Sequence, residues 1–422
     1  MKSDDNVIRV GGVGTGRVFT WAHAAVFPRL LEKARLVGFY DIDPRRAKVA
    51  RDDYVEKLNA YAGAHPQVAE DVEANLAELR VHDGLEDLLE QVDVIDVCTT
   101  TRGRMDAAVA ALEAGVHSMV EKPMARTWTE ADRAARAFRR KPDVFCQLND
   151  DNAFQPRYLL IRELLQQDVI GRVQSWWFIR GSSLEATSVL RSQADALSNG
   201  GGCLMDYGAH GLAGAWHALG RNYKPVKVEA VDIRVRCRDR VLEGQPWVME
   251  VDDNAQFKVL FEDPETGSWL TVFMEATWSG GSIGFTPNKE GTHDRLFLRV
   301  EGDRGIVDGG IREGVKVTHW DGGETLHPLK PPVPGEHPSF FDEINTFLDC
   351  VRTNTPPEID VHFGAEIIAI CDAAYLSAIR GETVTLNELK DFCRDYVKRY
   401  GDSTKADEAL LMDLLKPYRR NR

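Results

Sequence analysis

Residues 7–18 read VIRVGGVGTGRV, in which an apolar run typical of a buried strand leads directly into a glycine-rich turn. Gly12, Gly14 and Gly16 place small residues where the chain must turn tightly and where backbone amides can approach a pyrophosphate. A helix beginning at Arg17 and Val18 would present its positive end to that anion. Arg17 occupies the third glycine position of G-x-G-x-x-G, so the loop is compatible with dinucleotide binding or with an ordinary strand-to-helix turn.

An acidic residue follows the next apolar run at the position expected for a ribose contact. The run at 34–40 is followed directly by Asp41, which lies 27 residues after Gly14. A carboxylate there can accept hydrogen bonds from both ribose hydroxyls of adenosine and would repel the 2′-phosphate of NADP. NAD is therefore the expected cofactor, with NADP possible because Arg45 and Arg46 follow. The alternative interpretation of Asp41 is a helix cap ahead of Pro44.

The first third of the chain alternates short apolar runs with longer helical patterns, as strand-helix-strand units do. Helices are expected at 102–114, ended by Gly115, and at 129–140. The stretch 52–78 predicts two helices separated by Gly-Ala-His-Pro and is an insertion of unknown purpose. The pattern predicts an α/β Rossmann domain, a doubly wound parallel sheet, over residues 1–148. Its six strands are expected at 7–13, 34–40, 79–82, 92–98, 117–120 and 144–148.

From about residue 170 long strand patterns replace this alternation. A run of strands after a run of alternating units predicts an α+β domain with a large, mostly antiparallel open sheet over residues 149–422. Strands are expected at 173–180, 226–236, 255–261, 270–278, 296–300 and 315–320. Helical patterns return at 340–352, 364–378 and 386–399.

Composition narrows the class of protein further. A net charge of −14 disfavours binding to nucleic acid, and we find no run of about 20 apolar residues that indicates a membrane span. The N-terminus lacks the layout of a secretory signal, so a cytoplasmic location is expected. Seven scattered cysteines without a C-x-x-C pair disfavour disulfides and a thiolate zinc site, and no metal is expected.

Two clusters of reactive side chains lie at positions where a substrate could bind and react. Glu121-Lys122-Pro123 follows the fifth strand, at the sheet edge where open α/β domains bind ligands. The Lys122 ammonium would lie beside a nicotinamide ring and hydrogen-bond a substrate oxygen. The other interpretation is a solvated surface lysine.

The second cluster is the segment GGGCLMDYGAH at 200–210, a glycine-rich turn leading into a helix. Asp206 and His210 are four residues apart, so a helix would project both from one face. Oxidation of a carbinol requires a proton acceptor, and an imidazole titrating near neutrality suits that task. We therefore assign His210 as the base and Asp206 as its orienting group or a second hydroxyl ligand; a capping or surface pair is the alternative.

With these residues in view, the chain resembles the Gfo/Idh/MocA family, named after glucose-fructose oxidoreductase, inositol dehydrogenase and rhizopine catabolism. The resemblance covers nearly the whole chain through the glycine loop, Cys98-Thr99, Glu121-Lys122-Pro123, the segment ending at His210, and the helix 364–378. It implies that Lys122, Asp206 and His210 line a substrate pocket and that the protein is a homodimer or homotetramer. It also implies cofactor contacts from residues after the first, second, fourth and fifth strands. These are Gly12, Gly14, Thr15, Gly16, Arg17, Val18, Asp41, Thr99, Thr101, Arg104, Glu121 and Lys122.

The function expected from these features is hydride transfer between NAD(H) and a carbinol carbon of a sugar, sugar derivative or cyclic polyol. Two alternatives stay open. One is an NAD-retaining enzyme that cleaves glycosides or epimerises sugars through transient oxidation, and the other is a non-catalytic sugar and NAD sensor. Five side chains could stack on or hydrogen-bond a sugar ring, although core packing is as plausible for each of them. They are Trp176, Trp177, Arg180, Tyr207 and Trp278.

Overall fold

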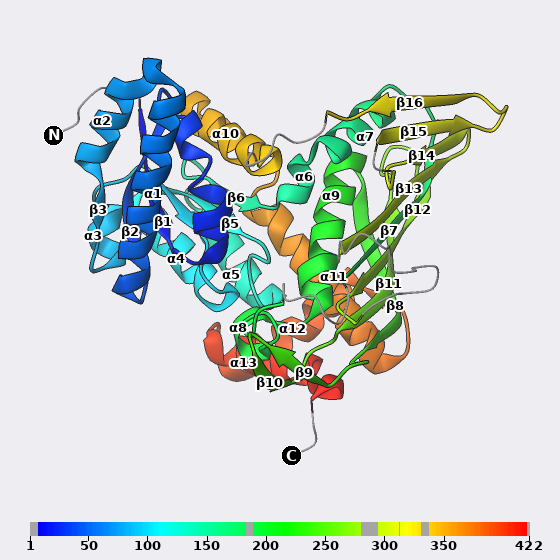
Figure 1. The fold of residues 1–422 in the computed structure, drawn as a ribbon. Coiled ribbons are helices and arrows are strands. Elements are labelled where there is room, and N and C mark those ends of the chain that lie inside the picture. Colours follow the sequence, from blue (N-terminus) through cyan, green and yellow to red (C-terminus); the bar gives the residue numbers. More distant parts are fainter. Residues whose placement is uncertain (1–6, 183–188, 280–293, 312, 331–336, 420–422) are drawn as a thin grey trace. The chain divides into compact units, whose positions relative to one another are not determined.

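The computed structural model describes residues 7–182, 189–279, 294–311, 313–330 and 337–419 (Figure 1). The chain divides into two compact units. Unit 1 comprises Met1–Met124, Asp132–Asp151 and Pro332–Phe363, and unit 2 comprises Ala125–Ala131, Asn152–Pro331 and Gly364–Arg422. The sequence pattern predicts a single division of the chain, after residue 148. The structure instead returns the late segment Pro332–Phe363 to unit 1.

Within the described residues, unit 1 is built on a six-stranded sheet of order β3-β2-β1-β4-β5-β6. Every neighbouring pair is parallel, which confirms the predicted doubly wound arrangement. The order reverses between β1 and β4, so the carboxyl ends of these two strands form the crevice where such sheets bind ligands. The strands are β1 (Ile8–Val13), β2 (Ala34–Tyr40), β3 (Arg80–Val81), β4 (Val94–Val97), β5 (His117–Glu121) and β6 (Cys146–Asn149).

The helices of unit 1 differ from the expected ones in one place. The helix after the glycine loop spans only residues 17–23, of which Phe19–His23 forms the π-helical turn η1, so the first crossover is short. The other elements are η2 (Phe27–Arg29), α1 (Pro44–Ala64), η3 (Pro66–Val68), α2 (Ala69–Glu78), α3 (Leu85–Leu89), α4 (Thr101–Ala114) and α10 (Pro338–Thr353). A further helix, α5 (Trp128–Arg139), begins in unit 2 and continues into unit 1. The insertion forms two helices with a break at Pro66, as predicted.

The late helix α10 belongs to unit 1 because its apolar face completes the core of that unit. Ile344, Phe347 and Leu348 are fully buried in one cluster with residues of β1 and β2. Burial of these three large side chains stabilises the folded chain by several kcal/mol relative to leaving them in water. Figure 1 shows α10 in orange beside elements drawn in blue, which come from the opposite end of the chain. Sequence order alone did not reveal this pairing.

Unit 2 contains, in the part of the chain that is described, a nine-stranded sheet of order β16-β15-β14-β13-β7-β12-β11-β8-β17. Only the β7–β12 pair among these neighbours is parallel, so the sheet is mostly antiparallel as predicted. The strands are β7 (Val173–Ser182), β8 (Lys224–Arg234), β11 (Asn254–Glu262), β12 (Trp269–Thr277), β13 (Asp294–Gly302), β14 (Gly305–Asp308), β15 (Gly314–His319), β16 (Glu324–Pro328) and β17 (Val384–Thr385). A separate hairpin consists of β9 (Asp239–Leu242) and β10 (Gln245–Val248).

Helix α9 (Ala209–Leu219) packs closely on the sheet through two glycines. A Cβ on Gly211 would lie 2.5 Å from the Phe178 ring, and one on Gly214 would lie 2.7 Å from the Tyr158 ring. The helix therefore approaches β7 and α7 (Pro156–Gln166) more closely than side chains would allow (Figure 1). The other elements are α6 (Asp151–Phe154), which begins with the last residue of the unit 1 segment, α8 (Ala196–Asn199), η4 (Leu204–Gly208), α11 (Val361–Arg380), α12 (Leu386–Tyr400), α13 (Thr404–Leu414) and η5 (Lys416–Tyr418).

One helix among the described residues, α11, is long and apolar enough by length and composition to cross a membrane. The sequence analysis did not single it out. However, 78% of its most apolar window is buried inside the protein, as in the core helix of a soluble domain.

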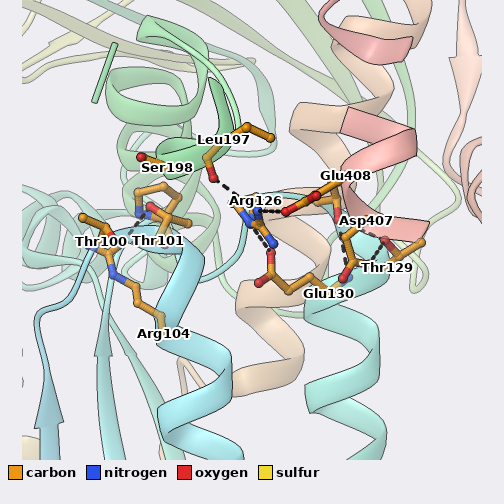
Figure 2. A network of polar contacts seen from close by, with 12 residues as sticks. Thr100, Thr101, Arg104, Arg126, Thr129, Glu130, Leu197, Ser198, Asp407 and Glu408 are labelled. Atoms are coloured by element: carbon orange, nitrogen blue, oxygen red, sulfur yellow. Dashed lines mark hydrogen bonds and ion pairs between the residues drawn. The ribbon is translucent and has the colours of Figure 1, made fainter. Parts of the chain in front are cut away.

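A buried polar network fixes the segment Ala125–Ala131 within unit 2 (Figure 2). The Arg126 guanidinium is 1% exposed and donates to Glu130 at 3.1 Å and to the Leu197 carbonyl at 3.2 Å. Thr129 donates its hydroxyl proton to Asp407 on α13 at 2.6 Å. Buried charged groups are stable only when paired, so this segment has one well-defined position in unit 2.

Candidate active site

The glycine loop of unit 1 requires two of its glycines for steric reasons. Gly14 has φ +79°, and a Cβ there would lie 2.6 Å from the backbone nitrogen of Thr99. A Cβ on Gly12 would lie 2.2 Å from the Phe19 ring. Among the described residues other than its chain neighbours, nothing lies within 4 Å of a Cβ built on Gly16. The loop therefore runs unusually close to the loop after β4, and Gly16 leaves its backbone accessible to a ligand.

Asp41 connects the glycine loop to the end of β2. Its buried carboxylate accepts hydrogen bonds from the Thr15 backbone N–H at 2.8 Å and from the Asp43 backbone N–H at 2.9 Å. The alternative interpretation of Asp41 as a helix cap is wrong, because the cap of α1 is Asp43, which accepts from the Arg45 N–H. Asp41 is thus held at the carboxyl edge of the sheet next to the loop. Its contact with a ribose stays a prediction.

The loop after β4 is fixed by Arg104. This buried guanidinium donates to the Thr99 carbonyl at 3.0 Å, to the Thr101 hydroxyl at 3.3 Å and to the Pro123 carbonyl at 2.5 Å. Arg104 therefore joins the ends of β4 and β5, and its contact with a cofactor stays a prediction.

Glu121 and Lys122 follow β5 and have different environments. The Lys122 backbone N–H donates to the Asn149 carbonyl at 3.1 Å, and its side chain is half-buried. The Glu121 carboxylate is buried and lies 3.2 Å from Nε2 of His23. Burial alone would raise the pKa of Glu121, but His23, Arg104 and Lys122 together lower it. Glu121 is therefore an anion held inside unit 1, and the contact of Lys122 with a substrate stays a prediction.

Sequence reasoning missed a buried polar cluster of unit 1, the His23 cluster. Nδ1 of His23 lies 2.8 Å from Asp96, and Cys98 Sγ lies 3.6 Å from the same nitrogen. Its members are His23, Asp96, Cys98, Glu121 and Glu343. Asp96 inside the apolar run VIDVC was the only signal in the sequence, because a charged residue in a buried strand needs a partner.

Within the His23 cluster the pKa values of His23 and Glu343 are both raised, but for different reasons. Burial alone would lower the pKa of His23, but Asp96 raises it well above its ordinary value. Burial raises the pKa of Glu343 well above its ordinary value, with His23 opposing and Glu121 adding to the shift. The cluster is thus an excess of acidic groups around one imidazole, shielded from water.

In unit 2, the turn at residues 200–202 places η4 and α9. Gly200 has φ +87°, and a Cβ there would lie 2.5 Å from the Arg126 carbonyl oxygen. A Cβ on Gly202 would lie 1.7 Å from the Asp252 carbonyl oxygen. Both positions exclude side chains, so the three-glycine run is a packing requirement of unit 2.

Asp252 is the second residue that sequence reasoning missed, and it anchors this turn. Its Oδ1 accepts from the Gly202 N–H at 2.9 Å and from the Tyr375 hydroxyl at 2.5 Å. Its Oδ2 accepts from the Leu204 N–H at 2.9 Å and from the Cys203 thiol at 3.3 Å. We call these five residues the Asp252 cluster. Burial raises the pKa of Asp252 and the four hydrogen bonds oppose this shift.

Asp206 and His210 come from η4 and α9 and are both buried, 7% and 6% exposed. Asp206 accepts a hydrogen bond from the Trp278 indole N–H at 3.3 Å. Nearby on β7, the Arg180 guanidinium lies 4.4 Å from the centre of the Tyr207 ring. Trp176 and Trp278 are fully buried, which assigns them to the core and not to sugar stacking. The chain is helical from Asp206 to His210, with Asp206 in a π-helical turn, and the projection of both side chains from one face stays a prediction.

The structure thus gathers the predicted residues into two sets. The cofactor set and Lys122 lie at the carboxyl ends of β1, β2, β4 and β5 in unit 1. Asp206 lies in η4 and His210 at the start of α9, both in unit 2. The meeting of Lys122 with His210 at one substrate stays a prediction.

Comparison with known proteins agrees with this arrangement. Residues 8–149 match the model of the family described as "Oxidoreductase family, NAD-binding Rossmann fold". The sheet and this match define an NAD-binding oxidoreductase of the Rossmann type. More particularly, the model that matches residues 8–149 is that of the Gfo/Idh/MocA oxidoreductases, which agrees with the predicted resemblance and with NAD as the predicted cofactor.

Curated relatives are distant. Levoglucosan dehydrogenase of Pseudarthrobacter phenanthrenivorans is 23% identical over 51% of this chain, which spans only 55% of that relative's length. Myo-inositol 2-dehydrogenase of Thermotoga maritima is 21% identical over 90% of this chain and 99% of the relative. D-apiose dehydrogenase of Paraburkholderia graminis is 23% identical over 71% of this chain and 75% of the relative.

Solved structures share the whole fold. An oxidoreductase domain protein from Kribbella flavida has a TM-score of 0.70 and 20% identity, covering 90% of this chain and 99% of that one. Levoglucosan dehydrogenase in complex with NADH and L-sorbose has a TM-score of 0.68 and 18% identity, covering 91% and 100%. These likenesses confirm the predicted two-part α/β fold.

Proposed function

We propose that the protein is an NAD-dependent dehydrogenase that oxidises a carbinol carbon of a sugar, sugar derivative or cyclic polyol, or reduces the corresponding carbonyl. The observation that carries this proposal is the position of Lys122, directly after β5 at the carboxyl edge of an NAD-binding sheet. The three curated relatives are named as dehydrogenases of an anhydrosugar, an inositol and a branched sugar, which supports this substrate class.

The residues present fit NAD. Gly14 and Gly16 bring backbone close to the expected pyrophosphate position, and the Asp41 carboxylate faces the Thr15 amide at the end of β2. NAD, when bound, would supply the hydride acceptor. An anion at Asp41 disfavours the 2′-phosphate of NADP, so we expect NAD to be preferred.

The protein side chains would manage the hydroxyl group. Lys122 would donate a hydrogen bond to the substrate oxygen and stabilise its negative charge as the O–H proton leaves. His210 would accept that proton, and Asp206, fixed by the Trp278 N–H, would orient His210 or a neighbouring hydroxyl. In the reverse direction His210 returns the proton to the oxygen.

The test is a panel of sugars, inositols and sugar acids with NAD and separately with NADP, followed by absorbance of the reduced nicotinamide. We expect Lys122→Ala and His210→Ala to lower kcat by roughly 10²- to 10⁴-fold, because each removes one proton-handling group. NAD binding measured by fluorescence should be largely unchanged. Lys141→Ala and His319→Ala, which alter other positions of the same residue types, are matched controls.

Near wild-type turnover in both active-site variants would refute these roles. Product formation without net NADH would instead favour the cofactor-retaining alternative. NAD and sugar binding without turnover of any tested compound would favour the sensor.

We also propose that the protein assembles as a homodimer or homotetramer through the open face of the nine-stranded sheet. Trp177 on β7 and Phe273 on β12 stack there, with ring centres 3.9 Å apart, and both are partly exposed. Large aromatic side chains on a sheet face favour association. Light scattering after gel filtration should show an oligomer for the wild type and a smaller species for Trp177→Glu. A monomeric wild type would contradict this.

A further inference from the structure

Among the described residues, no group donates a hydrogen bond to the buried carboxylate of Glu343 on α10. Its side chain is fully buried, and neither carboxylate oxygen has a hydrogen-bond partner among the described residues. A buried carboxylate normally accepts two or more hydrogen bonds, since an unpaired charge out of water costs several kcal/mol. This side chain therefore calls for a proton or for a ligand outside the polypeptide.

The unpartnered carboxylate is part of a compact set of metal-ligating atoms. Ligand atoms of His23, Glu121 and Glu343 all lie within 4.8 Å of one another. His23 Nε2 and Glu121 Oε1 are 3.2 Å apart. Two ligands bound to zinc at about 2.1 Å and separated by the tetrahedral angle lie about 3.4 Å apart. From the 4.8 Å limit, the Glu343 oxygen would need to approach the other two ligand atoms by up to about 1.4 Å to complete three protein ligands.

The other ring nitrogen of His23, Nδ1, has a carboxylate partner, as is typical of metal-bound histidines. Nδ1 lies 2.8 Å from Asp96, and donation of its proton to this carboxylate would leave the Nε2 lone pair facing Glu121 and Glu343. Metal-bound imidazoles typically donate their other N–H to a carboxylate, which fixes the tautomer and raises the basicity of the ligand. Phe340, whose ring centre lies 5.4 Å from that of His23, covers the cluster on one side.

The excess of acidic groups in the His23 cluster also favours a bound cation. Asp96, Glu121 and Glu343 are three acids around one imidazole inside a buried site. Arg104 and Lys122 act on Glu121 by charge, but they do not donate a hydrogen bond to Glu343. A divalent ion would balance this excess at its centre. An imidazole with carboxylates favours a transition metal over Mg²⁺ or Ca²⁺.

We propose that His23, Glu121 and Glu343 bind one divalent transition-metal ion, with zinc as the first candidate, as a structural site within unit 1. The ion joins the helical turn after the glycine loop, the end of β5 and α10. Because Lys122 follows Glu121 directly, the site also fixes the chain that carries Lys122. The proposal stands independently of the substrate.

The experiment uses the full-length protein without an affinity tag, stripped with a chelator and titrated with Zn²⁺ alone. Bound metal is measured by mass spectrometry after gel filtration, and Tm is followed with and without Zn²⁺. We expect about one ion per chain and a rise in Tm, since an ion that binds only the folded state stabilises it. Asp96→Asn should weaken binding by roughly 10- to 100-fold.

Glu343→Gln separates a metal ligand from a buried neutral acid. The amide has the shape of a protonated carboxyl group, so the variant should fold, while loss of the ligand should abolish stoichiometric binding. Asp349→Asn makes the same change on an exposed part of α10 and should bind like the wild type. Cys98→Ser should also retain the ion, because Cys98 lies on the Nδ1 side of His23.

Three results would overturn the proposal. Absence of stoichiometric Zn²⁺ in the wild type would mean that Glu343 is simply protonated. Retention of the ion by Glu343→Gln would place any metal elsewhere. Loss of the ion in Cys98→Ser would assign it to the His23, Asp96 and Cys98 side of the cluster.

Discussion

The Asp252 cluster of unit 2 and the His23 cluster of unit 1 both bury carboxyl groups, but the two clusters differ in how many hydrogen bonds those groups accept. In unit 2, Asp252 accepts four hydrogen bonds, two on each oxygen. In unit 1, Glu343 is equally buried and accepts none among the described residues. A saturated carboxylate fixes its surroundings, whereas an unsaturated one has capacity left for a ligand or proton. Satisfaction of hydrogen bonds, and not burial, therefore separates a structural anchor from a candidate site.

The largest effect expected from this contrast is on stability. Asp252→Ala leaves four buried donors without their acceptor, so we expect a loss of roughly 3–5 kcal/mol in the free energy of unfolding. Urea unfolding of the wild type and the variant measures this loss. Asp391→Ala removes an exposed carboxylate that pairs with Arg394 and should change stability by less than about 0.5 kcal/mol. Equal effects of the two substitutions would remove the distinction between the clusters.

Asp372 of unit 2 is an intermediate case and predicts a pH effect. Its Oδ2 accepts from the Trp128 N–H at 2.7 Å, but its buried Oδ1 has no partner among the described residues. Burial raises the pKa of Asp372 to about 8, and the neighbouring Asp407 and Glu130 add to the shift. In the unfolded chain its pKa is about 3.9.

The sign of the pH effect follows from these two pKa values. Between about pH 4 and pH 8 the folded state keeps a proton that the unfolded state has released, so this contribution to stability is lost as the pH rises through that range. The slope is at most about 1.4 kcal/mol per pH unit. Asp372→Asn cannot titrate, so its stability relative to the wild type should increase from pH 5 to pH 8. Urea midpoints that shift in parallel for both proteins would contradict this, and Asp391→Asn is the control.

Much of the fold was predictable because its signals are local. Gly14 needs a positive φ, Gly115 ends α4 at φ +76°, and period-two alternation marks the long strands of unit 2. The prediction of Lys122, Asp206 and His210 as the reactive trio also depends on local signals, because Lys122 follows a strand and Asp206 and His210 are four residues apart. Each of these signals comes from residues that are close to one another in the sequence.

The His23 cluster could not be predicted for the opposite reason. Its imidazole lies on the short helix after the glycine loop, Glu121 is 98 residues further along, and Glu343 is on α10. No spacing rule links such positions. The pairing depends on the return of α10 to the core of unit 1, which is decided by Ile344, Phe347 and Leu348. The same return explains why a single division of the chain after residue 148 does not describe the two units.

The smallest expected effect tests how much of the Asp252 anchor depends on a single donor. Tyr375→Phe removes the hydroxyl that donates to Oδ1, while the Gly202 N–H still donates to that oxygen at 2.9 Å. We expect a loss of about 1–2 kcal/mol, because one partner is removed and the carboxylate keeps three. Combined with Asp252→Ala, the second change should add little, because both act on the same bond. Full additivity in urea unfolding would show that Tyr375 stabilises unit 2 through its ring, which lies 5.7 Å from that of Tyr418, and not through Asp252.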